Sequence, residues 1–234
     1  MGRGGCKSQI GEQWCRCPVQ FRLSRFLPSP PKLLKEDMKK YQIIYADPPW
    51  SYDTWTYKQE LGKKNVAQGC ADEHYKTMKI EDICKLKVSE IADKDCKLFL
   101  WATPPCLQEA LQVMKAWGFE YKTIAFCWVK TNPKSKTPFF GIGHWTASNC
   151  ELVLAGMRKG GRLNRQDRSI SQIDLTPRGK HSVKPNTIRR NIVKLCGDVP
   201  RIELFARRDE GVMFDKLEGW DVWGNEVESD VMLT

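Results

Sequence analysis

Short apolar runs alternate along this chain with amphipathic segments of about a dozen residues, and no other feature constrains its fold as strongly. The apolar runs predict strands at residues 41–46, 97–102, 121–130, 151–156 and 201–207, and a short terminal segment at residues 219–226. The amphipathic segments predict helices at residues 79–91, 104–117 and 186–196. Strands that alternate with helices form a sheet covered on both faces. We therefore predict an α/β fold with a Rossmann-like, doubly wound, mostly parallel sheet.

Two of the predicted helices have recognisable ends. In residues 104–117, Pro105 suits an early helical position and Gly118 suits the position after the last turn. The apolar face of this helix is expected to carry Leu107, Ala110, Leu111 and Met114. Residues 186–196 repeat the pattern, with Gly197 at their end. Both helices are expected to bury their apolar faces against the sheet.

The first forty residues differ from the rest of the chain. They combine glycines, a basic stretch and a proline cluster at Pro28, Pro30 and Pro31, and this composition favours neither helix nor sheet. We expect residues 1–40 to form a basic arm and residues 41–234 to form a single domain, which suits a length of 234 residues. The sequence leaves open whether the arm is ordered.

Composition narrows the setting and the partners of the protein. The formal net charge of +10 favours a polyanionic partner, although charge alone fits a basic protein without a nucleic-acid role equally well. We find no secretory signal and no run of roughly 20 apolar residues that would span a bilayer, so we expect a cytoplasmic protein with reduced thiols and no membrane contact. Ten cysteines without a Cys-x-x-Cys pair, and three widely spaced histidines, argue against a metal site.

The four residues Asp47-Pro48-Pro49-Trp50 follow the first predicted strand, at a sheet edge where ligands gather. An adenine amino nitrogen is a poor nucleophile because its lone pair is delocalised into the ring. A carboxylate at Asp47 and the carbonyl of Pro48 can accept both amino hydrogens, return electron density to the nitrogen and align it with a methyl donor. The prolines fix this backbone, and we expect Trp50 to lie on the face of the base. The alternative is a proline-rich turn in which Asp47 caps a helix.

Eight short motifs follow one another between residue 41 and about residue 226. They are YADPPW (45–50), YKTM (75–78), LFLW (98–101), WVKTN (128–132), GHW (143–145), HSVKP (181–185), RIELFAR (201–207) and GNE (224–226). In this order they resemble the MT-A family of N6-adenine methyltransferases, whose namesake is the catalytic subunit of the mRNA adenosine methyltransferase and whose prokaryotic and phage members act on DNA. The resemblance implies that residues 41–234 form a methyltransferase domain and that its cofactor is S-adenosyl-L-methionine.

The resemblance also implies roles for individual residues. The catalytic motif would consist of Asp47, Pro48, Pro49 and Trp50, with Asp47 also at the cofactor. The adenosine and ribose of the cofactor would be held by Phe205, Arg207, Asn225 and Glu226. The nucleic acid and its target adenine would be contacted by Tyr75, His144 and Glu151, and Lys184 would touch both cofactor and substrate.

Some of these residues have plainer interpretations, and the chain departs from the expected pattern in two ways. Instead of binding the cofactor, Phe205 could be a residue of the hydrophobic core and Glu226 a solvated surface carboxylate. No acidic residue is found upstream of Asp47 to meet the adenine of the cofactor. A G-x-G-x-x-G phosphate cradle is absent too, which suits a cofactor without phosphate.

A second candidate surface for nucleic acid is the basic segment of residues 158–168. Its cations are Arg158, Lys159, Arg162, Arg165 and Arg168, and two interleaved glycines favour a loop that can follow a phosphate backbone. We expect these cations to contact phosphates. A solvated charged loop is the alternative.

Taken together, the residues and the resemblance predict methyl transfer to the N6 amine of an adenine that is flipped out of a duplex or single-stranded, with DNA favoured over RNA. One alternative is another acceptor, the N4 amine of cytosine or a protein glutamine amide. A second is a non-catalytic nucleic-acid-binding paralogue, against which the retained Asp47 argues. The sequence leaves open the recognition sequence and whether the protein works as a homodimer or with a partner subunit.

Overall fold

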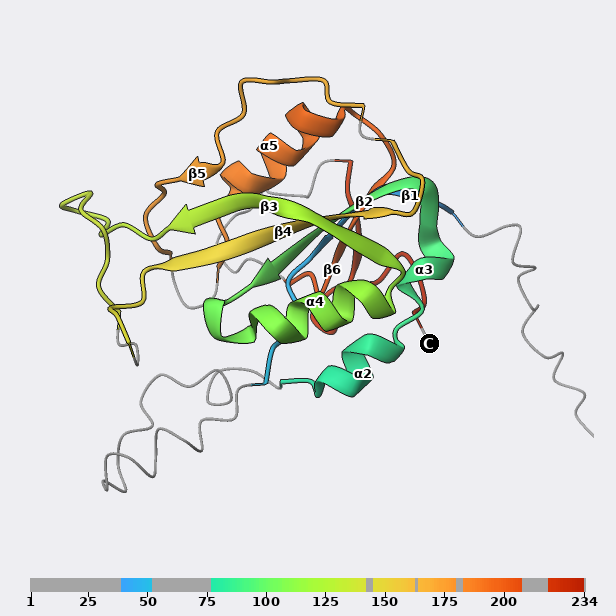
Figure 1. Cartoon of the computed structure of the whole chain (residues 1–234), viewed down its shortest axis with the longest axis horizontal. Helices are drawn as coiled ribbons and strands as arrows, with labels where there is room; N and C mark the ends of the chain where they lie inside the picture. Colours follow the sequence, from blue (N-terminus) through green and yellow to red (C-terminus); the bar gives the residue numbers. More distant parts are fainter. Residues whose placement is uncertain are drawn as a thin grey trace, which may run out of the picture. The chain divides into compact units, whose positions relative to one another are not determined.

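The computed structural model describes residues 39–51, 77–141, 145–162, 164–179, 183–207 and 219–233. Its centre is a seven-stranded sheet with the strand order β5-β3-β4-β2-β1-β6-β7 (Figure 1). The strands are β1 (Tyr41–Ala46), β2 (Ala92–Ala102), β3 (Phe119–Val129), β4 (Cys150–Arg158), β5 (Ile173–Asp174), β6 (Arg201–Leu204) and β7 (Asp221–Trp223). Within the described ranges, no helix is long and apolar enough to cross a membrane.

The sheet is mixed but mostly parallel, as predicted. β1 runs parallel to β2 and β6, β6 to β7, and β3 to β5, whereas β4 runs antiparallel to both of its neighbours, β2 and β3. The register places Ala102, the last residue of β2, opposite Leu152 near the start of β4. The start of β4 therefore lies at the edge where the parallel strands end, which we call the carboxyl edge.

Helices cover both faces of the sheet (Figure 1). On one face lie α2 (Ile80–Lys85), α3 (Val88–Ile91) and α4 (Leu107–Ala116), the last preceded by a 3₁₀ turn, and on the other lies α5 (Asn186–Cys196). Alternate residues of β1 point to opposite faces, so that Ile44 packs in the core with α2 to α4 while Ile43 and Tyr45 pack in the core with α5. Burial on both faces explains why β1 is a continuous apolar run.

Three predictions about the elements were wrong. Residues 79–91 form two short helices instead of one, because Leu86 has an extended backbone (ψ 129°) that ends α2. Leu111 is 36% exposed on α4, where Val113 is buried instead. The strand predicted to residue 207 ends at Leu204, because Phe205 has a φ of +61°, which no strand allows.

The structure leaves the expected arm largely untested. Residues 1–40 lie outside the described residues except for Lys39 and Lys40. The predicted helices at residues 104–117 and 186–196 are confirmed, and the glycines after them, Gly118 and Gly197, both have positive φ.

Candidate active site

The backbone of Asp47-Pro48-Pro49-Trp50 is fixed at the carboxyl edge by hydrogen bonds. The Asp47 N–H donates to the carbonyl of Leu204 at the end of β6 (3.4 Å), and the Trp50 N–H donates to the Pro48 carbonyl within the turn (2.9 Å). The Met78 N–H donates to the Pro49 carbonyl (3.0 Å). With the φ angles of both prolines locked by their rings, these bonds hold the backbone of Asp47 and the Pro48 carbonyl in one orientation.

Trp50 anchors the motif in the core. Its side chain is 4% exposed and packs with the core on the side of α2 to α4, and its indole N–H donates to the Trp101 carbonyl (3.1 Å). The expectation that Trp50 lies on a flipped base is therefore wrong for this structure, because core residues cover its ring. Its contribution to the motif is to hold the turn that presents Asp47.

Four alternating charges, which we call the charge row, cross the site. The Lys184 Nζ donates to the Asp47 Oδ2 (2.8 Å) and lies 3.4 Å from the Glu151 Oε2. The Lys130 Nζ lies 2.5 Å from the Glu151 Oε1. These residues come from the end of β1, the segment before α5, the start of β4 and the end of β3. The antiparallel direction of β4 is what brings Glu151 to the carboxyl edge.

Burial and neighbouring charges act in opposite directions on the pKa values of Glu151 and Lys184, and the charges prevail. Burial raises the pKa of the Glu151 carboxyl, but the positive charges of Lys184 and Lys130 outweigh burial and hold this pKa below its usual value. Burial likewise opposes the charged form of Lys184, but Asp47 and Glu151 outweigh it and hold the pKa of Lys184 above its usual value. Glu151 and Lys184 therefore both keep their charges at neutral pH.

Two tryptophans form an aromatic floor beneath the two lysines. The Lys184 Nζ lies 5.3 Å from the centre of the Trp101 ring, and the Lys130 Nζ lies 5.2 Å from the centre of the Trp128 ring. At these distances a cation and an aromatic ring attract each other. The two rings meet edge to face at 6.1 Å, and the Trp101 N–H donates to the Tyr45 hydroxyl (2.6 Å). This hydrogen bond therefore fixes the aromatic floor to β1.

The start of α5 is tied to two strands, and its position sets that of Lys184 just before it. The Thr187 hydroxyl donates to the Asp174 Oδ2 of β5 (2.5 Å). The Arg189 Nε lies 2.9 Å from the Glu203 Oε2 of β6. These two contacts join the first turn of α5 to one strand in each half of the sheet, and Lys184, just before this turn, lies beside Asp47.

Phe205 turns the chain out of the sheet at the end of β6. Its φ of +61° is uncommon for a residue with a large side chain and is the kind of strain found at ligand sites. Its half-buried ring packs against the core and meets the Trp223 ring edge to face at 5.2 Å. The structure thus gives Phe205 a core contact and a place at the carboxyl edge at the same time.

The other residues expected at the cofactor lie around a close approach between the segments that follow β6 and β7. The Ala206 N–H donates to the Trp223 carbonyl (3.0 Å), and a Cβ on Gly224 would clash with the Ala206 carbonyl, so only glycine fits there. This approach sets half-buried Arg207 next to the loop that carries Asn225 and Glu226, whose side chains are exposed.

The structure does not bring the basic segment to the charge row. β4 begins beside Glu151 and ends at Arg158, which is seven residues or about 23 Å along an extended strand. Arg162 and Arg165 follow at that far end, and the Arg158 guanidinium donates to the Ser89 carbonyl (3.4 Å). Tyr75 and His144 lie outside the described residues, and no group of metal-binding side chains occurs in the part of the chain that is described.

Lys130 belongs to the site, although reasoning from the sequence assigned it no role. It lies in the motif WVKTN, so the motif pointed to its surroundings. Its pairing with Glu151 depends on the register of β3 against β4, which places Trp128 opposite Glu151 and Val129 opposite Cys150. No local pattern in the sequence carries that register.

Comparisons with known proteins agree with the motifs. The family model described as MT-A70 matches residues 41–226. The chain is 37% identical over 199 residues to the type II methyltransferase M.MunI of Mycoplasma sp, covering 81% of this chain and 78% of that protein. It is 28% identical over 217 residues to the human N(6)-adenosine-methyltransferase catalytic subunit METTL3, covering 92% of this chain and 31% of that protein.

A third relative matches over a shorter stretch. The Arabidopsis thaliana N6-adenosine-methyltransferase non-catalytic subunit MTB is 36% identical over 101 residues, covering 42% of this chain and 11% of that protein. The family model spans most of the chain, and the match to M.MunI spans most of both proteins. The resemblance read from the eight motifs is thereby confirmed, and the chain belongs to the MT-A70 family.

Proposed function

We propose that this protein transfers a methyl group from S-adenosyl-L-methionine to the N6 amine of adenine in nucleic acid, and that DNA is its preferred substrate. The observation that carries the proposal is the Asp47 carboxylate, held at the carboxyl edge beside Lys184 and Glu151. Adenine is supported by the N6-adenosine activity named for two relatives. DNA is supported by the higher identity to the Mycoplasma relative, since prokaryotic members of this family act on DNA.

Asp47 and the Pro48 carbonyl, the two acceptors needed for the amine, can each accept one further hydrogen bond. Of the residues that the structure describes, Lys184 alone bonds the Asp47 carboxylate, and it does so through Oδ2, so that Oδ1 can accept one amino hydrogen. The Pro48 carbonyl accepts one bond, from the Trp50 N–H, and a carbonyl oxygen has a second lone pair for the other amino hydrogen. Two acceptors on a rigid turn would hold the amine in plane and direct its nitrogen lone pair.

The chain also offers groups that fit the cofactor. When bound, S-adenosyl-L-methionine supplies a methyl group on a positively charged sulfur. The exposed Glu226 carboxylate and Asn225 amide would accept and donate hydrogen bonds to ribose hydroxyls, and the half-buried Phe205 ring would cover the adenine. Asp47 would hold the amine and contribute to the cofactor site, and the methylated amine would lose one proton to solvent, with the cofactor, its carbon–sulfur bond broken, left as a neutral thioether.

A partner subunit or a second copy of the chain belongs to the proposal as well. Two relatives are named as subunits, one catalytic and one non-catalytic. On this chain, Phe140 and Trp145 in the loop before β4 are 73% and 98% exposed. Large apolar side chains exposed to this degree are typical of surfaces that become covered on assembly.

The test is incubation with labelled S-adenosyl-L-methionine and matched DNA and RNA oligonucleotides, single-stranded and duplex, followed by mass identification of the methylated nucleoside. We expect N6-methyladenine, formed faster in DNA than in RNA. Label in N4-methylcytosine or in protein glutamine would assign another acceptor. No transfer, together with no cofactor binding by calorimetry, would make the chain a non-catalytic paralogue.

A further inference from the structure

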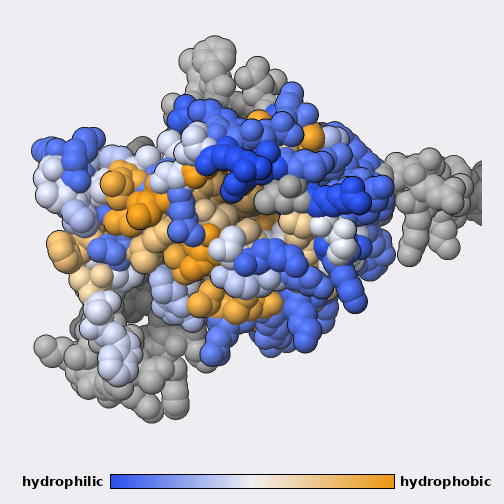
Figure 2. Space-filling view, turned by 45° about the horizontal axis from the view of Figure 1, so that its top comes forward, coloured by the Kyte–Doolittle hydropathy of each residue, from blue (hydrophilic) through white to orange (hydrophobic). Residues whose placement is uncertain are grey.

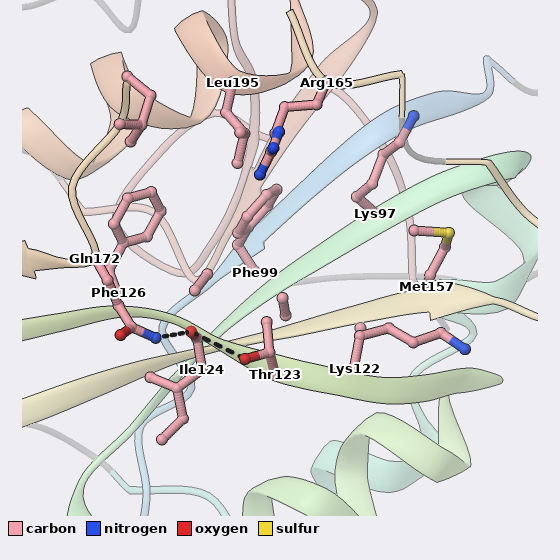
Figure 3. A pocket seen from close by; sticks show the side chains of 14 residues that line it. Lys97, Phe99, Lys122, Thr123, Ile124, Phe126, Met157, Arg165, Gln172 and Leu195 are labelled. Atoms are coloured by element: carbon pink, nitrogen blue, oxygen red, sulfur yellow. Dashed lines mark hydrogen bonds between the residues drawn. The ribbon is translucent and has the colours of Figure 1, made fainter. Parts of the chain in front are cut away.

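A cavity lies between α5 and the sheet, toward the edge opposite the charge row (Figure 3). Its volume is about 260 Å³, and its walls come from β2, β3, β4, α5 and the loop that follows β4. Lys97 on its β2 side lies five residues before the end of that strand at Ala102, which is about 16 Å along the strand. The cavity is therefore separate from the surface on which Asp47 lies.

The cavity exists because two small side chains lie among large ones. Phe99 and Phe126 fill the sheet face beneath α5, with ring centres 6.4 Å apart. Beside them, Ala125 on β3 and Ala155 on β4 leave space that the half-buried Leu195 of α5 does not fill. The floor of the cavity is thus apolar, although the molecular surface on this side alternates between hydrophilic and hydrophobic areas (Figure 2).

The charges around this apolar floor all have one sign. The lining contains Lys97, Lys122 and Arg165 and no acidic residue. Lys122 is engaged outside the cavity, with its Nζ 2.9 Å from the Glu120 Oε2. Arg165 extends from its loop toward the cavity (Figure 3), and its guanidinium has no hydrogen bond or ion pair with any described residue.

Lys97 is the most informative of the lining residues. It is 5% exposed, and among the described residues nothing forms a hydrogen bond or ion pair with its ammonium group. The stem of the side chain is buried, but the ammonium group itself reaches water and can pair with the anionic group of a dissolved ligand. The described part of this chain supplies no anion for it.

We propose that this cavity binds a small monoanion with an apolar body, a carboxylate whose head pairs with Lys97 and Arg165 and whose tail lies over Phe99, Ala125 and Ala155. The volume is slightly below the range of about 300–1,000 Å³ usual for drug-sized ligands, so the ligand is smaller than these.

Hexanoate and its neutral analogue hexanamide test the proposal on the full chain. Hexanoate at ten times its dissociation constant raises the melting temperature by about 3–6 °C and shifts the methyl resonances of Ile124, Ile170 and Leu195, whereas hexanamide does neither. Equal responses to both compounds, or shifts of methyl groups elsewhere only, would overturn the proposal. The readouts involve no methyl transfer, so Asp47→Ala is expected to bind hexanoate like the wild type even if the proposed function fails.

Three variants locate the site. Lys97→Met keeps the length of the side chain and removes the charge, so it abolishes the hexanoate response without lowering the melting temperature of the free protein. Ala155→Leu fills the cavity and also abolishes the response. Lys122→Met is the matched control, because it removes a rim cation that already has a partner, and it retains the response. If Lys97→Met keeps the hexanoate response, Lys97 does not bind the carboxylate. If the ligand-free Lys97→Met protein melts at a lower temperature than the wild type, Lys97 already has a stabilising partner, and either result overturns the proposal.

Discussion

At the scale of single residues, Glu151 is the carboxylate on which the charges of the site depend, because it pairs with Lys184 through one oxygen and with Lys130 through the other. Asp47 and Glu151 together keep the pKa of Lys184 high. Lys184 in turn holds one oxygen of Asp47, which leaves the other oxygen for the amine in the proposed reaction. Glu151 therefore acts on Asp47 through a lysine that contacts both carboxylates.

The pH dependence of methyl transfer reports on this arrangement. Because the pKa of Glu151 is lowered in the folded protein, its ionised carboxylate stabilises the fold at pH values above about 4.3, the usual pKa of a glutamate. This stabilisation is lost as the pH falls through the folded-state pKa. Because the pKa of Lys184 is raised in the folded protein, its charged ammonium group stabilises the fold at pH values below about 10.4, the usual pKa of a lysine. This stabilisation is lost as the pH rises through the folded-state pKa. Neither group titrates near neutrality.

We therefore expect the rate of methyl transfer to show no ionisation of Glu151 or Lys184 between about pH 6 and pH 9. Glu151→Gln removes one of the two charges that raise the pKa of Lys184, so the rate of this variant falls at a lower alkaline pH than that of the wild type. Rates measured against pH for both proteins test this. A wild-type ionisation inside the window that disappears in Glu151→Gln would contradict it.

Trp50 gives a second prediction at this scale. Trp50→Phe removes the N–H that satisfies the Trp101 carbonyl, and an unsatisfied buried carbonyl costs about 1–3 kcal/mol in the free energy of unfolding. Urea denaturation measures this loss, and Trp145→Phe, at a side chain 98% exposed, is the control that leaves stability unchanged. A tenfold rise in KM for nucleic acid with no loss of stability would restore the stacking role of Trp50.

At the scale of elements, local signals in the sequence predict some boundaries and leave others out of reach. The helix at residues 186–196 was predictable because its apolar residues recur at helical spacing and Gly197, whose φ is +89° in the structure, follows its last turn. The break at Leu86 was not, since nothing in the sequence around it requires an extended backbone. The two residues of β5 are too few for any period, and the antiparallel direction of β4, on which the place of Glu151 depends, is fixed by pairing with β2 and β3.

The junction between α5 and β6 is testable as an element. Glu203→Gln leaves Arg189 without its full charge partner in a site where the Glu203 side chain is 8% exposed, so we expect a loss of about 3 kcal/mol in the free energy of unfolding. The matched control is Glu120→Gln, whose pair with Lys122 is about half exposed and whose loss changes stability by less than about 1 kcal/mol. Urea denaturation compares the two. Equal effects would show that this ion pair does not hold α5 in place.

At the scale of the whole molecule, the net charge of +10 and the distance between the charge row and the basic segment set the requirements for nucleic-acid binding. The two lie about 23 Å apart along β4, which corresponds to about seven base pairs at 3.4 Å each. If the segment contacts phosphates, only a nucleic acid longer than this reaches both places.

We accordingly expect that a triple variant weakens binding of a 20-base-pair duplex. It changes three exposed cations that do not line the cavity beneath α5, as Lys159→Gln, Arg162→Gln and Arg168→Gln. The slope of log affinity against log salt should become shallower by about 0.9 for each phosphate that the variant no longer neutralises. Binding of a six-base-pair duplex is the control and should not change. Fluorescence anisotropy over a range of salt concentrations measures both. An unchanged slope with the long duplex would leave the segment as a solvated loop.

The central claim is that Asp47 grips the amine that takes the methyl group, and Asp47→Ala tests it most directly in single turnovers at saturating cofactor, with folding checked by thermal melting. Loss of a charge-assisted hydrogen bond of about 1.5–3 kcal/mol lowers the rate of N6-methyladenine formation roughly ten- to hundredfold, and further if the alignment is lost too. A wild-type rate of adenine methylation by Asp47→Ala would contradict the claim.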